Sequence, residues 1–123
     1  MCAAYATIAN GGVYNSPTMY TKILDHDGNV LLENTQETRT VLKDSTAALL
    51  TSAMETVVES GTGTACRLSN MPVAGKTGTT TSKKDLWFCG YTPYYTCAVW
   101  VDTTTTRNVT MTVTSVSACG RVS

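Results

Sequence analysis

Three strand-like segments with short connections constrain the fold of this chain most. Residues 73–79, 86–91 and 96–101 carry the β-branched and aromatic side chains that are typical of strands. A Thr-Pro-Tyr-Tyr turn at 92–95 joins the last two segments. Because parallel neighbours need crossover connections of a dozen or more residues, these short links predict an antiparallel sheet.

Two helical patterns precede the predicted sheet. The first is alanine-rich, runs over residues 2–10 and ends at Gly11-Gly12, where glycine readily adopts positive φ. The second is expected to begin with Asp44 or Ser45 as its N-cap and to run to about Glu59. Apolar side chains at helical spacing predict its core stripe: Leu50, Met54, Val57 and Val58.

A surface hairpin is predicted between the two helices. Apolar segments at 20–24 and 30–32 flank an Asp-His-Asp-Gly-Asn turn at 25–29. The single histidine, His26, lies in this turn and is interpreted as a solvated residue. The order of the elements predicts an α+β fold, in which an antiparallel β-sheet is flanked by helices.

Composition argues against several classes of partner. Nine basic and nine acidic side chains leave a formal net charge of +0, so no overall field attracts nucleic acid or anionic lipid. The sequence shows no targeting signal and no apolar run near the roughly 20 residues that span a bilayer. Five aromatic residues are interpreted as core side chains rather than as a stacking platform for nucleic acid or sugar: Trp87, Phe88, Tyr91, Tyr94 and Tyr95.

The cysteine pattern predicts neither a metal site nor a bound cofactor. The five cysteines include no Cys-x-x-Cys pair, and zinc sites usually need that spacing or several histidines. Cys89 and Cys97 lie on either side of Pro93, so a hairpin would bring them near each other. They either form a disulfide in an exported protein or remain free thiols in the core, and we interpret them as free thiols.

The residues with the clearest chemical potential are Lys76-Thr77-Gly78-Thr79 in the first strand of the predicted sheet. Lys76 supplies positive charge, while Thr77 and Thr79 lie on one face of the strand and can both donate hydrogen bonds. Gly78 leaves room for another backbone to approach the strand. This pattern suits an extended substrate that ends in a carboxylate.

The same residues belong to a longer series that resembles one known family. Lys-Thr-Gly is the last of three motifs of penicillin-binding proteins and class A β-lactamases. The transpeptidase domain of bifunctional, class A penicillin-binding proteins is similar to four segments in this order: AYATIANGG at 4–12, VESGTGTA at 58–65, VAGKTGT at 73–79 and DLWFCGYTP at 85–93. The resemblance covers residues 1–101 and implies the C-terminal part of a penicillin-binding, serine β-lactamase-like domain. Residues 102–123 are predicted to form a divergent, Thr-rich tail.

The resemblance also implies an activity and its partners. In the family, a serine attacks the carbonyl between two terminal D-alanines of a peptidoglycan stem peptide and passes the acyl group to an amine of a neighbouring stem. β-Lactams acylate the same serine. On that basis Lys76, Thr77 and Thr79 hold the terminal carboxylate, Gly78 keeps the groove open, and the backbone N–H of Thr79 contributes to the oxyanion hole. The parent protein is implied at the bacterial cell membrane, with this domain on the cell-wall side and the membrane reached only through upstream segments.

The catalytic serine and base of the family are not found in this sequence. No serine stands in a Ser-x-x-Lys motif, and no Ser-x-Asn triplet occurs. Both motifs lie upstream of the helix that residues 2–10 resemble, so Met1 is expected to be an internal residue and the chain a fragment. We therefore expect this chain alone to be catalytically inactive.

Two other interpretations are open at this point. The chain is a non-catalytic module that binds peptide or β-lactam without acylation, or a truncated remnant. Alternatively, Gly75-Lys76-Thr77 is the end of a phosphate-binding P-loop, but that motif needs a glycine where Asn70 stands and a helix after the lysine. The predicted strand and loop at 73–82 argue against this second interpretation.

Overall fold

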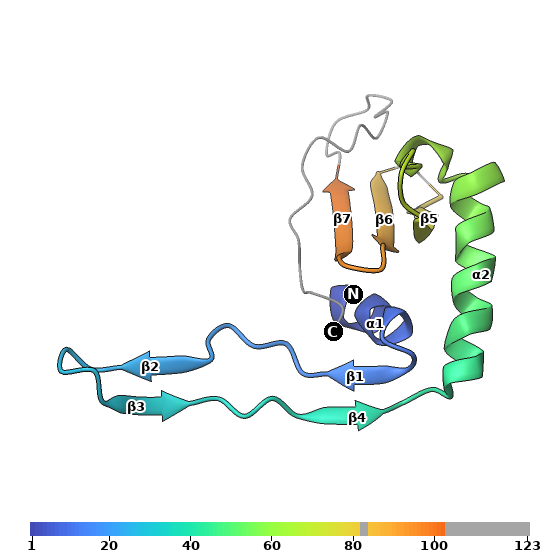
Figure 1. Cartoon of the computed structure of the whole chain (residues 1–123). Coiled ribbons are helices and arrows are strands. Elements are labelled where there is room, and N and C mark those ends of the chain that lie inside the picture. The colour runs from blue at the N-terminus through green and yellow to red at the C-terminus, as the bar shows by residue number, and fades with distance from the viewer. Residues whose placement is uncertain (82–83, 103–123) are drawn as a thin grey trace.

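The computed structural model describes residues 1–81 and 84–102, which form an α+β body and a long projecting arm (Figure 1). The body holds the antiparallel sheet of β5 (Ala74–Thr79), β6 (Asp85–Tyr91) and β7 (Thr96–Asp102), with β6 in the centre. Two helices, α1 (Cys2–Ala9) and α2 (Asp44–Ser60), and the short 3₁₀-helix η1 (Thr64–Cys66) complete the body. The predicted fold class and the three predicted strands are confirmed.

The register of the sheet assigns each side chain to one of two faces. Gly75 pairs with Gly90, and Gly90 pairs with Cys97, so these three residues lie on one face of the sheet. Residues two positions away along each strand lie on the same face. Lys76 pairs with Cys89 on the other face. The helices cover the Cys89 face, where α1 contacts β6 and β7 and α2 contacts β5.

The core lies between the helices and the Cys89 face. Polar contacts fix the packing there: the Thr51 and Tyr91 hydroxyls are 2.8 Å apart, and Cys2 Sγ donates to the Thr96 carbonyl at 3.6 Å. The most deeply buried apolar residues of this layer are Ala47, Val58, Ala74, Cys89 and Tyr91.

The first helix ends as predicted, at two glycines with positive φ. Gly11 has φ 62° and Gly12 has φ 90°. A Cβ on Gly12 would collide with the backbone carbonyl of Leu42. Because of this close approach, the Gly12 carbonyl accepts hydrogen bonds from the N–H groups of Val41 and Leu42, at 2.8 and 3.1 Å. These bonds connect the segment just after α1 to the segment just before α2.

Two details predicted for α2 are wrong. Lys43 holds the N-cap position without a side-chain capping bond, and Asp44 is already the first helical residue. Leu50 is 41% exposed, although the stripe was predicted to be core. The buried residues Ala47 and Val58 and the half-buried Thr51 and Met54 show that the sheet-facing stripe passes one position to the side of Leu50.

The aromatic residues also differ from the prediction in part. Phe88 and Tyr91 are buried and Trp87 is half-buried, but Tyr94 and Tyr95 are 58% and 55% exposed. Both tyrosines lie in the β6–β7 turn, which projects beyond the sheet, so no layer covers them. Trp87 stacks on the exposed Trp100 of β7, with ring centroids 5.9 Å apart.

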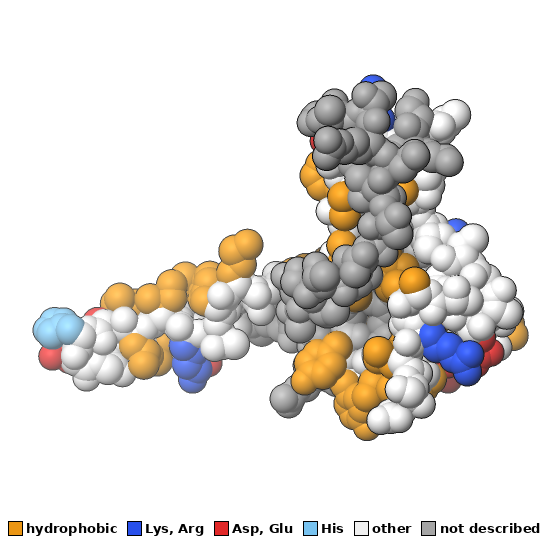
Figure 2. Space-filling view, turned by 90° about the horizontal axis from the view of Figure 1, so that it is seen from above, with side chains coloured by type: hydrophobic (Ala, Val, Ile, Leu, Met, Phe, Trp, Pro, Cys, Tyr) orange, Lys and Arg blue, Asp and Glu red, His pale blue; other side chains and the backbone are white. Residues whose placement is uncertain are grey.

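The arm consists of two antiparallel ladders in series (Figure 1). Next to the body, β1 (Val13–Asn15) pairs with β4 (Thr38–Thr40), and further out β2 (Lys22–Leu24) pairs with β3 (Val30–Glu33). The outer ladder confirms the predicted hairpin, with His26 exposed at its tip. Figure 2 shows apolar side chains along the arm, and the exposed ones include Ile23, Leu24, Val30, Leu31 and Leu32.

No helix among residues 1–81 and 84–102 has the length and apolar character needed to cross a membrane. The Thr-rich tail predicted after residue 101 lies outside the described residues, apart from Asp102 at the end of β7.

Candidate functional site

The Lys-Thr-Gly residues lie on β5, an edge strand of the three-stranded sheet. The N–H of Thr80 donates to the carbonyl of Asp85 on β6 at 3.1 Å. Because backbone groups of an antiparallel strand point alternately to its two sides, the N–H and C=O of Thr79 and Thr77 are directed away from β6. Within the described chain, β5 therefore presents an edge that is open to strand pairing.

The ammonium group of Lys76 lies along this open edge. Its Nζ donates a 2.7 Å hydrogen bond to the carbonyl of Thr77, and the Lys76 side chain is exposed. A cation therefore stands beside the backbone groups that an extended ligand would meet. The arrangement suits a ligand that offers both a backbone and an anionic end.

Thr77 and Thr79 share one face of β5, as predicted, and the register places them opposite Phe88 and Leu86. The Thr77 hydroxyl lies 2.7 Å from the hydroxyl of Thr62, which belongs to the loop after α2. The structure thus brings Thr77 together with a residue that the sequence interpretation did not single out. The signal was present in the VESGTGTA segment, but no periodic pattern links residues 15 positions apart.

Three glycines allow close packing around this strand. Gly78 stands opposite Trp87, and a Cβ there would lie 3.3 Å from Trp87 Cβ. Gly75 and Gly90 face each other under the ring of Phe88, and a Cβ on either would approach that ring to 2.7–2.8 Å. Phe88 is therefore seated directly against the backbone of β5, one residue before Lys76.

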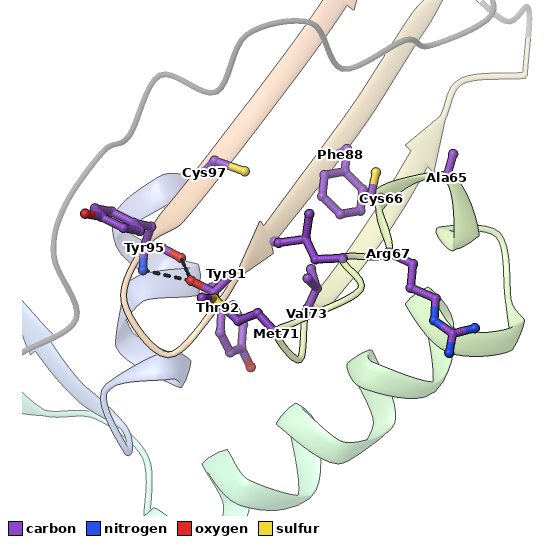
Figure 3. Close-up of a pocket in the computed structure, with 12 residues that line it drawn as sticks. Ala65, Cys66, Arg67, Met71, Val73, Phe88, Tyr91, Thr92, Tyr95 and Cys97 are labelled. Carbon is purple, nitrogen blue, oxygen red and sulfur yellow. Dashed lines mark hydrogen bonds between the residues drawn. The ribbon is translucent and has the colours of Figure 1, made fainter.

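A separate hollow of about 510 Å³ lies on the sheet face opposite α1 and α2 (Figure 3). It is lined by apolar side chains from η1, the loop after it, β6 and β7, among them Cys66, Met71, Val73, Phe88 and Cys97. Arg67 points away from the hollow in Figure 3. None of Lys76, Thr77, Gly78 and Thr79 lines it, so the hollow and the open edge of β5 are two distinct places.

The cysteines of the sheet are free thiols, as interpreted from the sequence. Cys89 pairs with Ala98 and Cys97 pairs with Gly90, so the two thiols leave opposite faces of the sheet. Burial raises the pKa of both thiols, and Cys66, across the hollow from Cys97, is shifted the same way for the same reason.

Comparison with known proteins gives one consistent match. The family model described as "Penicillin binding protein transpeptidase domain" matches residues 1–118. Penicillin-binding protein 1A from Clostridium acetobutylicum is 48% identical over 102 residues, which are 82% of this chain and 13% of that protein. Penicillin-binding protein 1A/1B from Bacillus subtilis is 37% identical over 114 residues, covering 81% of this chain and 12% of that protein.

Solved structures with a similar fold carry related descriptions. The D,D-transpeptidase domain of a peptidoglycan glycosyltransferase from Eggerthella lenta superposes with a TM-score of 0.69 at 29% identity, over 75% of this chain and 23% of that one. The penicillin-binding protein PonA1 from Mycobacterium tuberculosis superposes with a TM-score of 0.69 at 34% identity, over 84% of this chain and 28% of that one. The chain thus spans 13% or less of the length of the two curated relatives. The family match continues past residue 101, and the boundary predicted there stays a prediction.

Proposed function

The chain belongs to the penicillin-binding protein transpeptidase family, and from this premise we propose that it supplies the substrate-binding strand of a peptidoglycan D,D-transpeptidase. The substrate is a stem peptide that ends in D-Ala-D-Ala, and β-lactams occupy the same strand as its mimics. The observation that carries this proposal is the open edge of β5, with the Lys76 ammonium beside it.

Each residue of the strand has a role in the proposal. The substrate backbone pairs with the open edge, and Gly78 leaves room for it. Lys76, Thr77 and Thr79 bind the terminal carboxylate of the peptide, or the carboxylate of a β-lactam. The N–H of Thr79 points to the same edge and donates to the oxyanion that forms at the attacked carbonyl.

The acyl-transfer step itself needs a serine nucleophile and a base, which the proposal assigns to segments of the parent protein outside this sequence. Without them the chain binds its ligand and forms no acyl-enzyme. The alternative function is a module that binds peptide or β-lactam without acylation. It applies if this chain works without a parent protein that supplies the serine and the base. The proposal also puts the parent protein at the bacterial cell membrane, with this domain on the cell-wall side, and the family relationship supports this location.

Binding of a matched pair of peptides tests the proposal. Diacetyl-Lys-D-Ala-D-Ala and its C-terminal amide differ in the carboxylate alone, so the ratio of their Kd values measures carboxylate recognition. We expect the chain to prefer the acid, and Lys76→Gln to reduce that preference about tenfold, because a charge-assisted hydrogen bond is lost from an exposed site. NMR titration with the chain at fixed pH gives both constants.

Two controls sharpen this test. Lys22→Gln removes the same charge from the arm, where Lys22 forms an exposed ion pair with Glu33, and should leave the ratio unchanged. Incubation with a fluorescent penicillin should leave no label that survives denaturation. Equal affinity for acid and amide in the unmodified chain contradicts the proposed binding role, and a drug-competed covalent label contradicts the assignment of the nucleophile to other segments.

A further inference from the structure

The hydroxyl of Thr62 contacts the Lys-Thr-Gly strand from outside the sheet. We propose that Thr62 is a positioning residue, which holds the Thr77 hydroxyl with its proton directed toward the substrate carboxylate. The inference rests on the proposed function of β5. It adds to the binding site Thr62, which belongs to the loop after α2 and not to β5 itself. Its basis is the 2.7 Å separation of the two hydroxyl oxygens.

The backbone around Thr62 is held in place by the end of α2. The N–H groups of Gly61 and Gly63 both donate to the carbonyl of Val57, at 3.1 and 3.0 Å. A Cβ on Gly61 would lie 2.8 Å from the same carbonyl oxygen, so this tight return of the chain requires a residue without a side chain. Gly63 is buried against Val58. Thr62, between the two glycines, is thereby presented to β5 by an anchored loop.

Proton counting shows what the contact does. Each threonine hydroxyl carries one proton and two acceptor lone pairs, so only one of the two oxygens donates within the pair. When Thr62 donates, Thr77 accepts and keeps its own proton for another acceptor. A carboxylate at the edge of β5 selects this arrangement, because it accepts the Thr77 proton and each bond in the resulting chain strengthens the other.

Without the Thr62 hydroxyl, Thr77 loses its internal donor. Its hydroxyl proton then turns about the Cβ–Oγ1 bond or is donated to water, and part of the binding free energy is lost in fixing its direction. The expected loss is that of one neutral, exposed hydrogen bond, which corresponds to a factor of about three to ten in affinity. The loss applies to ligands with a carboxylate and not to ligands that lack one.

The acid and amide peptides described above separate this role from a merely structural one. Thr62→Val keeps the branched shape and removes the hydroxyl, and we expect it to lower the acid-to-amide affinity ratio about three- to tenfold, while amide binding stays the same. Thr62→Ser restores the hydroxyl and should restore the ratio. Thr64→Val, at an exposed position two residues further on at the start of η1, serves as the matched control and should behave like the unmodified chain.

The outcomes distinguish this inference from the function on which it rests. An unmodified chain without preference for the acid overturns the proposed function and the role of Thr62 with it. A chain that prefers the acid, and keeps that preference in Thr62→Val, supports the function of β5 and overturns the role of Thr62. Equal losses for acid and amide in Thr62→Val show a structural contact only. Should Thr62→Val unfold, Thr62→Ala removes the same hydroxyl from this exposed position and gives the same comparison.

Discussion

At the scale of single residues, the ring of Phe88 packs closely against two glycines of the sheet. Its ring occupies the space above Gly75 and Gly90, which face each other across β5 and β6. Phe88 is only 4% exposed, and its ring fills the space that a side chain at either glycine would need. The backbone of β5 next to Lys76 therefore depends on two residues that have no side chain.

Replacing Gly90 with alanine should destabilise the fold through this contact. A Cβ at Gly90 would lie 2.8 Å from Cε1 and 2.9 Å from Cζ of Phe88. We expect Gly90→Ala to lower the free energy of unfolding by about 1–3 kcal/mol, as overpacking does in other cores. Urea denaturation followed by tryptophan fluorescence measures this change.

A double-mutant cycle isolates the cause. Leucine at position 88 lacks the two ring atoms that the new Cβ would meet, so Gly90→Ala should cost clearly less in the Phe88→Leu background. If the cost is the same in both backgrounds, the ring is not the source of the strain.

Residue identity alone predicted only part of the site. Lys76, Thr77, Gly78 and Thr79 stand out in the sequence because a cation, two hydroxyls and a glycine follow one another along one strand, and their binding role stays a prediction. Thr62 was not, because its role depends on the fold of the α2–β5 loop, which brings it to Thr77. Gly75 and Gly90 were missed as a pair for a related reason: only the register shows that they lie opposite each other.

At the scale of elements, the outer hairpin is held by its own turn. The Asp25 carboxylate accepts hydrogen bonds from the N–H groups of Asp27 and Asn29, at 2.9 and 2.8 Å, and from Asn29 Nδ2 at 3.1 Å. The side-chain bond from Asn29, followed by the backbone bonds, lowers the pKa of Asp25 below its ordinary value of 3.8. Among the described helices and strands, β2 and β3 contact only each other, so this turn has no tertiary support.

Asp25→Ala should loosen the hairpin without weakening the body. We expect amide hydrogen exchange to rise over 22–33 and to stay unchanged in β5, β6 and β7, because the two parts share no packing. Asp25→Asn keeps one acceptor oxygen and should give a smaller rise. Lower pH acts in the same direction: the depressed pKa favours the folded turn above pH 3.8, and that contribution is lost as the pH falls through the folded value. A uniform rise of exchange over the whole chain contradicts this independence.

The helices and strands were largely predictable from the sequence. The buried face of α2 and its first residue were not. Short connections and strand composition located β5, β6 and β7, and glycines located the end of α1. The stripe of α2 was misplaced at Leu50, because Ala47 and Thr51 are too small or too polar to mark a core face in the sequence, although they are the residues that meet the sheet side. The start of α2 was misplaced because Asp44 resembles an N-cap but lies inside the helix.

At the scale of the whole molecule, buried weak acids make stability depend on alkaline pH. Burial raises the pKa of Cys66, Cys89 and Cys97 above 9.0 and that of Tyr91 above 10.0. A raised pKa means that the folded chain keeps the proton to higher pH than the unfolded chain does. Stability is therefore fully present below about pH 9 and decreases as the pH rises through the folded values.

Unfolding in urea between pH 7 and pH 11, under reducing conditions, measures this decrease. Tyr91→Phe should lower stability by about 1 kcal/mol at neutral pH, because the hydrogen bond with Thr51 is lost. Above pH 10 the same variant should lose stability less steeply than the unmodified chain, because one titrating group is gone. Parallel curves for the two proteins over that range contradict the assignment to Tyr91.

Within residues 1–81 and 84–102, the arm joins the body only through its inner ladder. Since β1 contacts α1 and pairs with β4, while β2 and β3 contact no other described helix or strand, the arm is a ribbon supported at one end. Such a ribbon acts as a lever: a small rotation at Val13 or Thr40 becomes a larger sideways displacement of His26. A small change in the orientation of α1 on the sheet therefore produces a larger displacement of the hairpin tip.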